Sequence, residues 1–255
     1  MLGWSINLFR IRGIQISLNW LFFLLLAWVC MDGWKDGRML GVEWGVALLV
    51  AFFFCILLHE LGHSLVAMKF GIRVPRILLT PIGGMALFDS IPRKPYQEFL
   101  VTIAGPAVNF AIAALLWCFV DTPDGWLYDT SLASPSDFGR TLLRWNIFVA
   151  LFNLIPAFPM DGGRILRAML ATFMSYVRAT FWAAAVAKVL VVGAIAWSVY
   201  TQNYYYVLLG VFIFRAGDIE YRNVKALDQH EARLRELIAR QNEVPPPGEP
   251  PVLGA

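Results

Sequence analysis

The chain has 255 residues, of which 58% are hydrophobic and 15% charged, and its net charge at pH 7 is +3. A mean hydropathy of +0.61 excludes an ordinary soluble domain and indicates a protein that crosses a lipid bilayer several times. The net charge is small and the basic residues lie in short loops, so we expect the bilayer but no nucleic acid as a partner.

The N-terminal part of the chain is expected to hold a hairpin and two membrane spans. Residues 5–17 alternate apolar and polar side chains on both sides of Gly13, a pattern typical of a short β-hairpin. Apolar runs over about 18–31 and 42–69 then predict two transmembrane helices, and the second of them carries two of the three histidines.

A second hairpin is predicted between residues 72 and 95, where glycine and proline are too frequent for a helix. Its strands would cover 77–80 and 85–88, on either side of a turn at 81–84. The segment is apolar enough to enter the bilayer, where non-helical backbone is tolerated only under a cover of protein or beside a water-filled cavity. An equal alternative is that Gly83-Gly84 serves only the turn.

Four more spans give a total of six. They are expected at about 96–120, 141–155, 178–200 and 204–216. Pro156 and Pro159 end the fourth span, and a helix resumes near Asp161. The predicted fold class is therefore an all-α membrane protein, with six transmembrane helices and short N-terminal and membrane-associated β-hairpins.

The last forty residues are charged and are expected to lie outside the membrane. The predicted boundary divides a membrane domain, residues 1–216, from a tail, residues 217–255. Within the tail, residues 219–241 favour a surface helix, and the proline-rich end from 244 to 255 is typical of a disordered segment.

Loops that contain Lys and Arg alternate along the chain with loops that are acidic or nearly uncharged. The loop from Asp121 to Asp137, for example, contains four aspartates and no Lys or Arg. Because basic loops stay in the cytoplasm, this alternation predicts that both termini are cytoplasmic. We interpret Arg164, Arg167 and Arg178 as part of the inside-facing charge anchor.

The most informative residues are His59 and His63, which stand with Glu60 in an apolar stretch where ionisable groups are costly and usually functional. The H-E-x-x-H spacing puts both imidazoles on one face of a helix, about 6 Å apart along its axis, so that they can share one ion. Zinc lowers the pKa of water toward about 7, and Glu60 could take the released proton. The motif predicts a metal-dependent hydrolase, and a buried hydrogen-bonded histidine pair is the alternative.

A catalytic zinc needs a third protein ligand and an open position. Cys55 lies eight residues from His63, about 12 Å along a helix, which is too far to share an ion, and His230 lies in the tail. Asp161 is the best candidate, because it follows a proline-broken segment and precedes two glycines that permit a close backbone approach. Alternatively, Asp161 caps the helix that begins there.

Together these features resemble the site-2 proteases, a family of intramembrane zinc metalloproteases. The resemblance covers about residues 1–215 and rests on His59 to His63, Gly83-Gly84, Ala104 to Asn109 and Asn153 to Arg164. It implies that His59, His63 and Asp161 bind Zn²⁺, that Glu60 is the catalytic base, and that Asn109 is a second catalytic residue near the substrate or the oxyanion. The alternative for Asn109 is a hydrogen-bonded bridge between helices.

The resemblance further implies what the protein acts on. Residues 1–216 would form an intramembrane metalloprotease domain, in which the second hairpin presents an extended substrate. The predicted direction of the second and fourth spans puts the active site in the cytoplasmic half of the bilayer. The substrate would be a single-span membrane protein, cut within or near its transmembrane segment in regulated intramembrane proteolysis. No PDZ domain or CBS pair is expected in this chain. Two rival hypotheses are a zinc transporter or sensor that uses the same ligands, and a catalytically silent scaffold.

Overall fold

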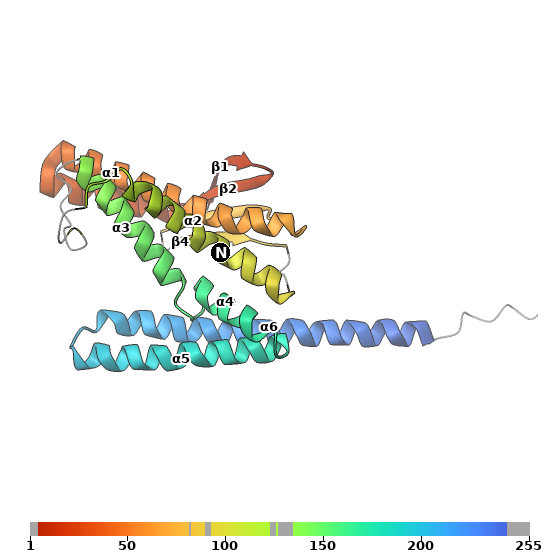
Figure 1. Cartoon of the computed structure of the whole chain (residues 1–255). Helices are drawn as coiled ribbons and strands as arrows, with labels where there is room; N and C mark the ends of the chain where they lie inside the picture. The colour runs from red at the N-terminus through yellow and green to blue at the C-terminus, as the bar shows by residue number, and fades with distance from the viewer. Residues whose placement is uncertain (1–4, 82, 90–92, 123–125, 127–134, 244–255) are drawn as a thin grey trace, which may run out of the picture.

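The computed structural model describes residues 5–243 except 82, 90–92, 123–125 and 127–134. The described chain is mostly helical, with one small sheet at its N-terminal side (Figure 1). The strands are β1 (Ser5–Ile11), β2 (Ile14–Asn19), β3 (Arg76–Thr80) and β4 (Gly83–Leu87). The helices are α1 (Leu21–Lys69), α2 (Pro95–Trp117), α3 (Pro135–Asn153), α4 (Asp161–Leu170), α5 (Tyr176–Tyr200) and α6 (Tyr205–Glu243).

Both predicted hairpins are confirmed, and they combine into one four-stranded sheet of order β1-β2-β3-β4. The first turns at Gly13, whose φ of +89° favours glycine. The second is tighter than expected, since β4 already begins at Gly83. The hairpins join through a parallel pairing of β2 with β3, in which Gln15 lies opposite Arg76. The two predicted hairpins thus lie side by side in one sheet, of which β4 is an edge strand.

Helix α1 folds back on itself. The rings of Phe22 and Phe53 lie 4.8 Å apart between centroids, although 31 residues of straight helix would separate them by about 46 Å. The two legs meet at a glycine pair, because a Cβ at Gly33 would lie 2.6 Å from the carbonyl oxygen of Gly41. The first two predicted spans are therefore the antiparallel legs of α1.

The main apolar core lies where the sheet packs against α1. Its buried members come from both sides of this contact and include Ile14, Ile16, Phe53, Ala67 and Ile77. Because α1 also packs against α2, the sheet and α2 hold the second leg of α1 from two directions. That leg carries His59 and His63.

Three helices of the described chain are long and apolar enough to cross a membrane. They are Met39–Lys69 within α1, α2 and α5, which correspond to the second, third and fifth predicted spans. Length and composition therefore support an integral membrane protein, and the full set of six passes stays a prediction.

Helix α6 differs from the sequence prediction. It runs without a break for 39 residues, where separate helices were expected over 204–216 and 219–241. A single glycine, Gly217, lies at the expected break, and its cost in a helix is only about 1 kcal/mol. The Lys188 ammonium of α5 binds Asp218 and lies 4.9 Å over the ring of Phe214, which holds α6 against α5 at this point. The predicted disorder of residues 244–255 lies outside the described residues.

Arg167 is another correction, because it is completely buried rather than part of a membrane-flanking anchor. Its Nε and Nη2 donate to Glu98 of α2 at 2.9 and 2.5 Å, and its Nη1 donates to Glu220 of α6 at 2.5 Å. The hydroxyl of Tyr176 in α5 donates to Glu98 at 3.1 Å. Figure 1 shows α4 between α2 and the long α5–α6 pair, so this one cation links four helices.

Candidate metal centre

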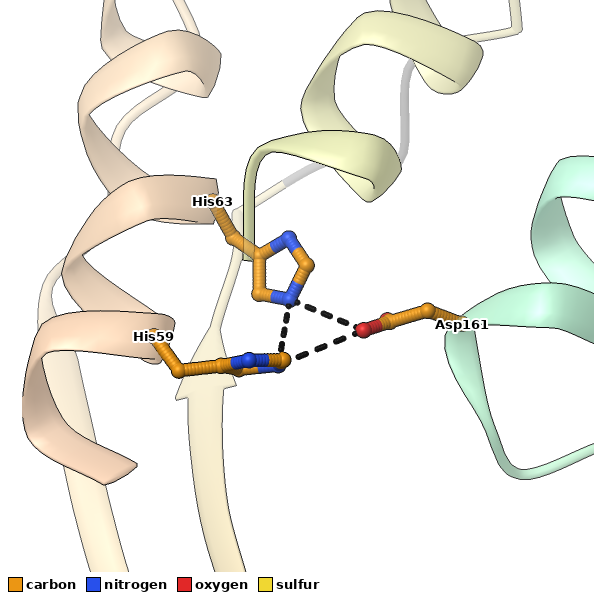
Figure 2. Close-up of side chains that lie close together, drawn as sticks. All are labelled: His59, His63 and Asp161. Atoms are coloured by element: carbon orange, nitrogen blue, oxygen red, sulfur yellow. Dashed lines mark hydrogen bonds and ion pairs between the residues drawn. The ribbon is translucent and has the colours of Figure 1, made fainter. Parts of the chain in front are cut away.

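His59 and His63 of α1 meet Asp161 of α4 at one point (Figure 2). The two Nε2 atoms lie 3.0 Å apart, and Oδ2 of Asp161 lies 3.3 Å from His59 Nε2 and 3.2 Å from His63 Nε2. Both histidines are buried, and the Asp161 side chain is 13% exposed. The structure therefore brings the third candidate ligand to the histidine pair across about a hundred residues of chain.

The three donor atoms fit a zinc ion. Two atoms bound to one tetrahedral zinc at about 2.0–2.1 Å lie about 3.3–3.4 Å apart, close to the three separations found here. Two histidines and one carboxylate are also a donor set of known catalytic zinc sites. Among the residues that the structure describes, this is the one group of three His, Cys, Asp or Glu side chains close enough to share an ion.

The hydrogen bonds behind the two rings show which nitrogens face the centre as acceptors. Nδ1 of His63 lies 2.8 Å from the carbonyl oxygen of Val101, and Nδ1 of His59 lies 2.5 Å from Oδ1 of Asn109. Both partners are acceptors, so each Nδ1 carries the proton and each Nε2 presents a lone pair. Oδ2 of Asp161, the third atom of the triangle, is buried without a hydrogen-bond donor among the described residues. Three facing lone pairs repel unless a cation lies between them.

The Asp161 carboxylate turns toward the two imidazoles (Figure 2). Asp161 is the first residue of α4 after the N-cap Met160, and no side-chain hydrogen bond caps the helix. The geometry therefore favours a ligand over the alternative of a helix cap.

The two glycines after Asp161 explain how it reaches the pair. A Cβ at Gly162 would fall within 3 Å of the carbonyl groups of the turn that follows α3, and a Cβ at Gly163 would lie 2.7 Å from the carbonyl carbon of Ala157. Only glycine lets this turn fold over the start of α4. The predicted close backbone approach is confirmed at both positions.

Glu60 lies between α1 and the sheet. Its Oε2 accepts a hydrogen bond of 3.1 Å from the N–H of Ala86 in β4. A Cβ at Gly84 would lie 2.8 Å from Oε1 of Glu60 and closer still to its Cγ. The two glycines therefore have different roles. Gly83 begins β4 directly after the turn with a φ of +147°, whereas Gly84 makes room for Glu60.

Gly105 of α2 forms another side of the centre. A Cβ there would lie 2.7 Å from Nε2 of His59 and closer to Nε2 of His63. At the same crossing, a Cβ at Gly62 would lie 2.8 Å from the carbonyl oxygen of Ala104, so α1 and α2 touch backbone to backbone. A missing side chain therefore keeps space open beside the donor atoms, as a bound ion requires.

Asn109 lies behind the ring of His59 and is 1% exposed. Its Oδ1 faces His59, and its Nδ2 donates to Oδ1 of Asn146 in α3 at 2.9 Å. Both of its polar groups are thus engaged by the protein, whereas the sequence suggested contact with substrate or oxyanion; a catalytic role for Asn109 stays a prediction. Asn146, which is also 1% exposed, was not among the residues predicted from the sequence. The available signal was a polar side chain directly before the apolar run from Ile147 to Phe152.

Comparisons with known proteins agree with this geometry. The sequence model of Peptidase family M50 matches residues 47–136 and 128–196. The zinc metalloprotease MJ0392 of Methanocaldococcus jannaschii is 36% identical over 237 residues, which cover 89% of this chain and 66% of that protein. The putative zinc metalloprotease sll0528 of Synechocystis is 33% identical over 176 residues, which cover 65% of this chain and 44% of that protein. The chain thus spans less than two thirds of the length of either relative.

A solved structure gives the same result for the fold. The site-2 protease from Methanocaldococcus jannaschii superposes with a TM-score of 0.60 at 36% identity. The match covers 86% of this chain and 95% of that one. The likeness therefore extends over most of the chain rather than over the metal-binding motif alone.

Proposed function

This chain belongs to Peptidase family M50, the family of the site-2 proteases, and we propose that it hydrolyses a peptide bond within or near the transmembrane segment of another membrane protein. The observation that carries the proposal is the buried triangle of His59, His63 and Asp161 donor atoms. The proposed substrate is a single-span membrane protein, and the proposed process is regulated intramembrane proteolysis.

Zinc is the cofactor, and we propose His59, His63 and Asp161 as its ligands. When bound, zinc supplies Lewis-acid polarisation of the scissile carbonyl and a lowered pKa of water. Glu60 adjoins His59 in the chain, and the N–H of Ala86 holds its carboxylate between α1 and β4. In this proposal Glu60 takes the proton of the attacking water and delivers it to the leaving amine.

Replacement of Glu60 by glutamine is expected to abolish cleavage and leave zinc bound. The amide keeps the size of the side chain and an acceptor for the Ala86 N–H, but it cannot accept the proton. The measurement compares membrane-protein fragments by proteomics in cells that express wild-type protein or Glu60→Gln, and zinc content in the purified proteins. Glu236→Gln, an exposed change in α6, is the matched control.

The results distinguish the peptidase from the two alternative functions, a zinc transporter and a scaffold. Cleavage retained in Glu60→Gln would end the peptidase proposal. Zinc flux into proteoliposomes that does not depend on Glu60 would favour a transporter. Carefully purified wild-type protein without zinc would favour a scaffold.

The edge strand β4 supports the proposed handling of substrate. A transmembrane helix hides its backbone, so the cleaved segment must become extended before water can reach a peptide bond. Strand β4 ends the sheet, and the N–H of Ala86 faces the catalytic side at Glu60. We propose that an extended substrate adds to this edge, since a free sheet edge offers main-chain hydrogen bonds to a new strand.

Replacement of Ala86 by proline tests the hydrogen bond that holds Glu60 at this edge, because it removes the N–H that donates to Glu60 while proline remains tolerated on edge strands. Hydrogen bonds to charged groups contribute about 1.5–3 kcal/mol, so we expect cleavage to fall at least about tenfold with zinc retained. Ala86→Gly keeps the N–H and is the control. Cleavage of a substrate at the wild-type rate by Ala86→Pro would show that this hydrogen bond is not needed to position Glu60.

The proposed topology keeps all six predicted passes: the two legs of α1, then α2, α3, α5 and the first part of α6. Residues 1–216 are proposed as the protease domain and 217–255 as a cytoplasmic tail, with both termini and the active site toward the cytoplasm. The support is the distribution of Lys and Arg among the loops. The test is a C-terminal fusion to a reporter enzyme that works only outside the cytoplasm. Activity of this reporter would contradict the proposed orientation.

A further inference from the structure

Behind His59, a chain of buried side chains crosses three helices. Nδ2 of Asn146 donates to the carbonyl oxygen of Leu142 at 2.9 Å, within α3. Oδ1 of Asn146 accepts from Nδ2 of Asn109 in α2 at 2.9 Å. Oδ1 of Asn109 in turn lies 2.5 Å from Nδ1 of His59 in α1. The chain therefore begins at a backbone carbonyl and ends at a proposed metal ligand.

The direction of every bond in this chain follows from its first member. A carbonyl oxygen only accepts, so the amide nitrogen of Asn146 must face Leu142 and its oxygen must face Asn109. Asn109 must then present its nitrogen to Asn146 and its oxygen to His59. Nδ1 of His59 is left as the donor, which leaves the lone pair on Nε2, the atom that faces Asp161.

We propose that Asn146 is a positioning residue of the metal centre, which acts through Asn109 to fix the His59 tautomer that presents the Nε2 lone pair to the ion. The inference rests on the proposed function only for the identity of that ion. Asn146 itself touches neither His59 nor Asp161 in any hydrogen bond of the described chain. Partners that orient a ligating histidine change metal affinity by about 10–100-fold when they are removed.

The two histidines have different hydrogen-bond partners, so only His59 can lose its partner through a side-chain substitution. His63 donates to the backbone carbonyl of Val101, which no side-chain substitution removes. His59 depends on two asparagine side chains, each 1% exposed, so water is not at hand to replace a lost partner. The alternative role for Asn146 is packing alone, as a polar bridge between α2 and α3. A packing role would change stability but not the tautomer of His59.

The first test needs no variant. The chain has three histidines, so ¹⁵N-histidine labelling of the full-length protein in detergent micelles gives a simple spectrum. In metal-free wild-type protein we expect the ¹⁵N shifts of His59 to report a proton on Nδ1 and none on Nε2. A proton on Nε2 of His59 would overturn the proposal.

The second test measures zinc affinity by chelator competition. Asn146→Leu is expected to weaken zinc binding by about 10–100-fold and to give His59 a mixture of tautomers. Asn146→Ala is measured in the same way if the leucine variant does not purify as a folded protein. The control is Thr180→Val in α5, which removes a buried bond of the same kind, 2.8 Å to the carbonyl oxygen of Tyr176, far from the centre in the chain. We expect the control to keep wild-type affinity.

A double-mutant cycle separates a relay from two independent effects. If Asn146 acts through Asn109, then Asn146→Leu should weaken zinc binding in the wild-type background and have no further effect in an Asn109→Leu background. Equal effects in both backgrounds, or wild-type affinity in Asn146→Leu, would overturn the proposal. Wild-type protein that binds no zinc would instead contradict the proposed function, so the two failures are distinguishable.

Discussion

Replacement of Gly105 by alanine is expected to give a folded protein that neither binds zinc nor cleaves a membrane substrate. The new Cβ would lie 2.7 Å from Nε2 of His59 and closer to Nε2 of His63, in the space beside the donor atoms. His63 cannot turn away without losing its 2.8 Å hydrogen bond to Val101. Alanine is favoured over glycine in a helix by about 1 kcal/mol, so we expect the metal and not the fold to be lost. Elemental analysis of the purified protein measures its zinc content, and thermal melting measures its stability.

Gly193→Ala is the matched control. It makes the same change within α5, where a Cβ would meet nothing within 4 Å. We expect this variant to keep its zinc and its cleavage, with a slightly raised melting temperature. One zinc per chain and wild-type cleavage in Gly105→Ala would show that the ion binds elsewhere.

The three candidate ligands could be predicted because their signals are local. His59 and His63 share a helix face through their spacing alone. Asp161 stands out because prolines end one helix before it and glycines follow it. The turn at Gly13 is local in the same way, since its positive φ is a property of one residue. Such features do not depend on which distant segments come together.

Contacts between distant segments left no comparable signal. Strand β2 pairs with β3 across 61 residues, from Gln15 to Arg76. The sequence of either hairpin does not indicate which distant strand will pair with it. Arg167 resembled a membrane-flanking base because its partners lie 69 and 53 positions away in the chain. An asparagine beside an apolar run predicts a hydrogen bond between helices but not its target, so Asn146 could not be connected to His59.

Replacement of Arg167 by methionine is expected to lower the free energy of unfolding by about 3–5 kcal/mol, because it leaves the buried Glu98 carboxylate without its cation. Methionine can still fill the apolar space against Phe158 and Tyr176, over whose rings the guanidinium lies at 5.3 and 4.9 Å. The melting temperature in detergent should fall by roughly 6–20 °C. Zinc occupancy should fall with it, since α4 carries both Arg167 and Asp161.

Arg178→Met is the control for this change, because Arg178 is exposed at the start of α5 and surface substitutions usually shift stability by no more than about 0.5 kcal/mol. The double variant Arg167→Met, Glu98→Gln should regain part of the lost stability, since a neutral amide replaces the uncompensated carboxylate. Glu220, the other partner, has a side chain that is 23% exposed and can be hydrated. A double variant as unstable as Arg167→Met would assign the loss to packing, whereas partial recovery would show that Arg167 holds the four helices together by neutralising Glu98.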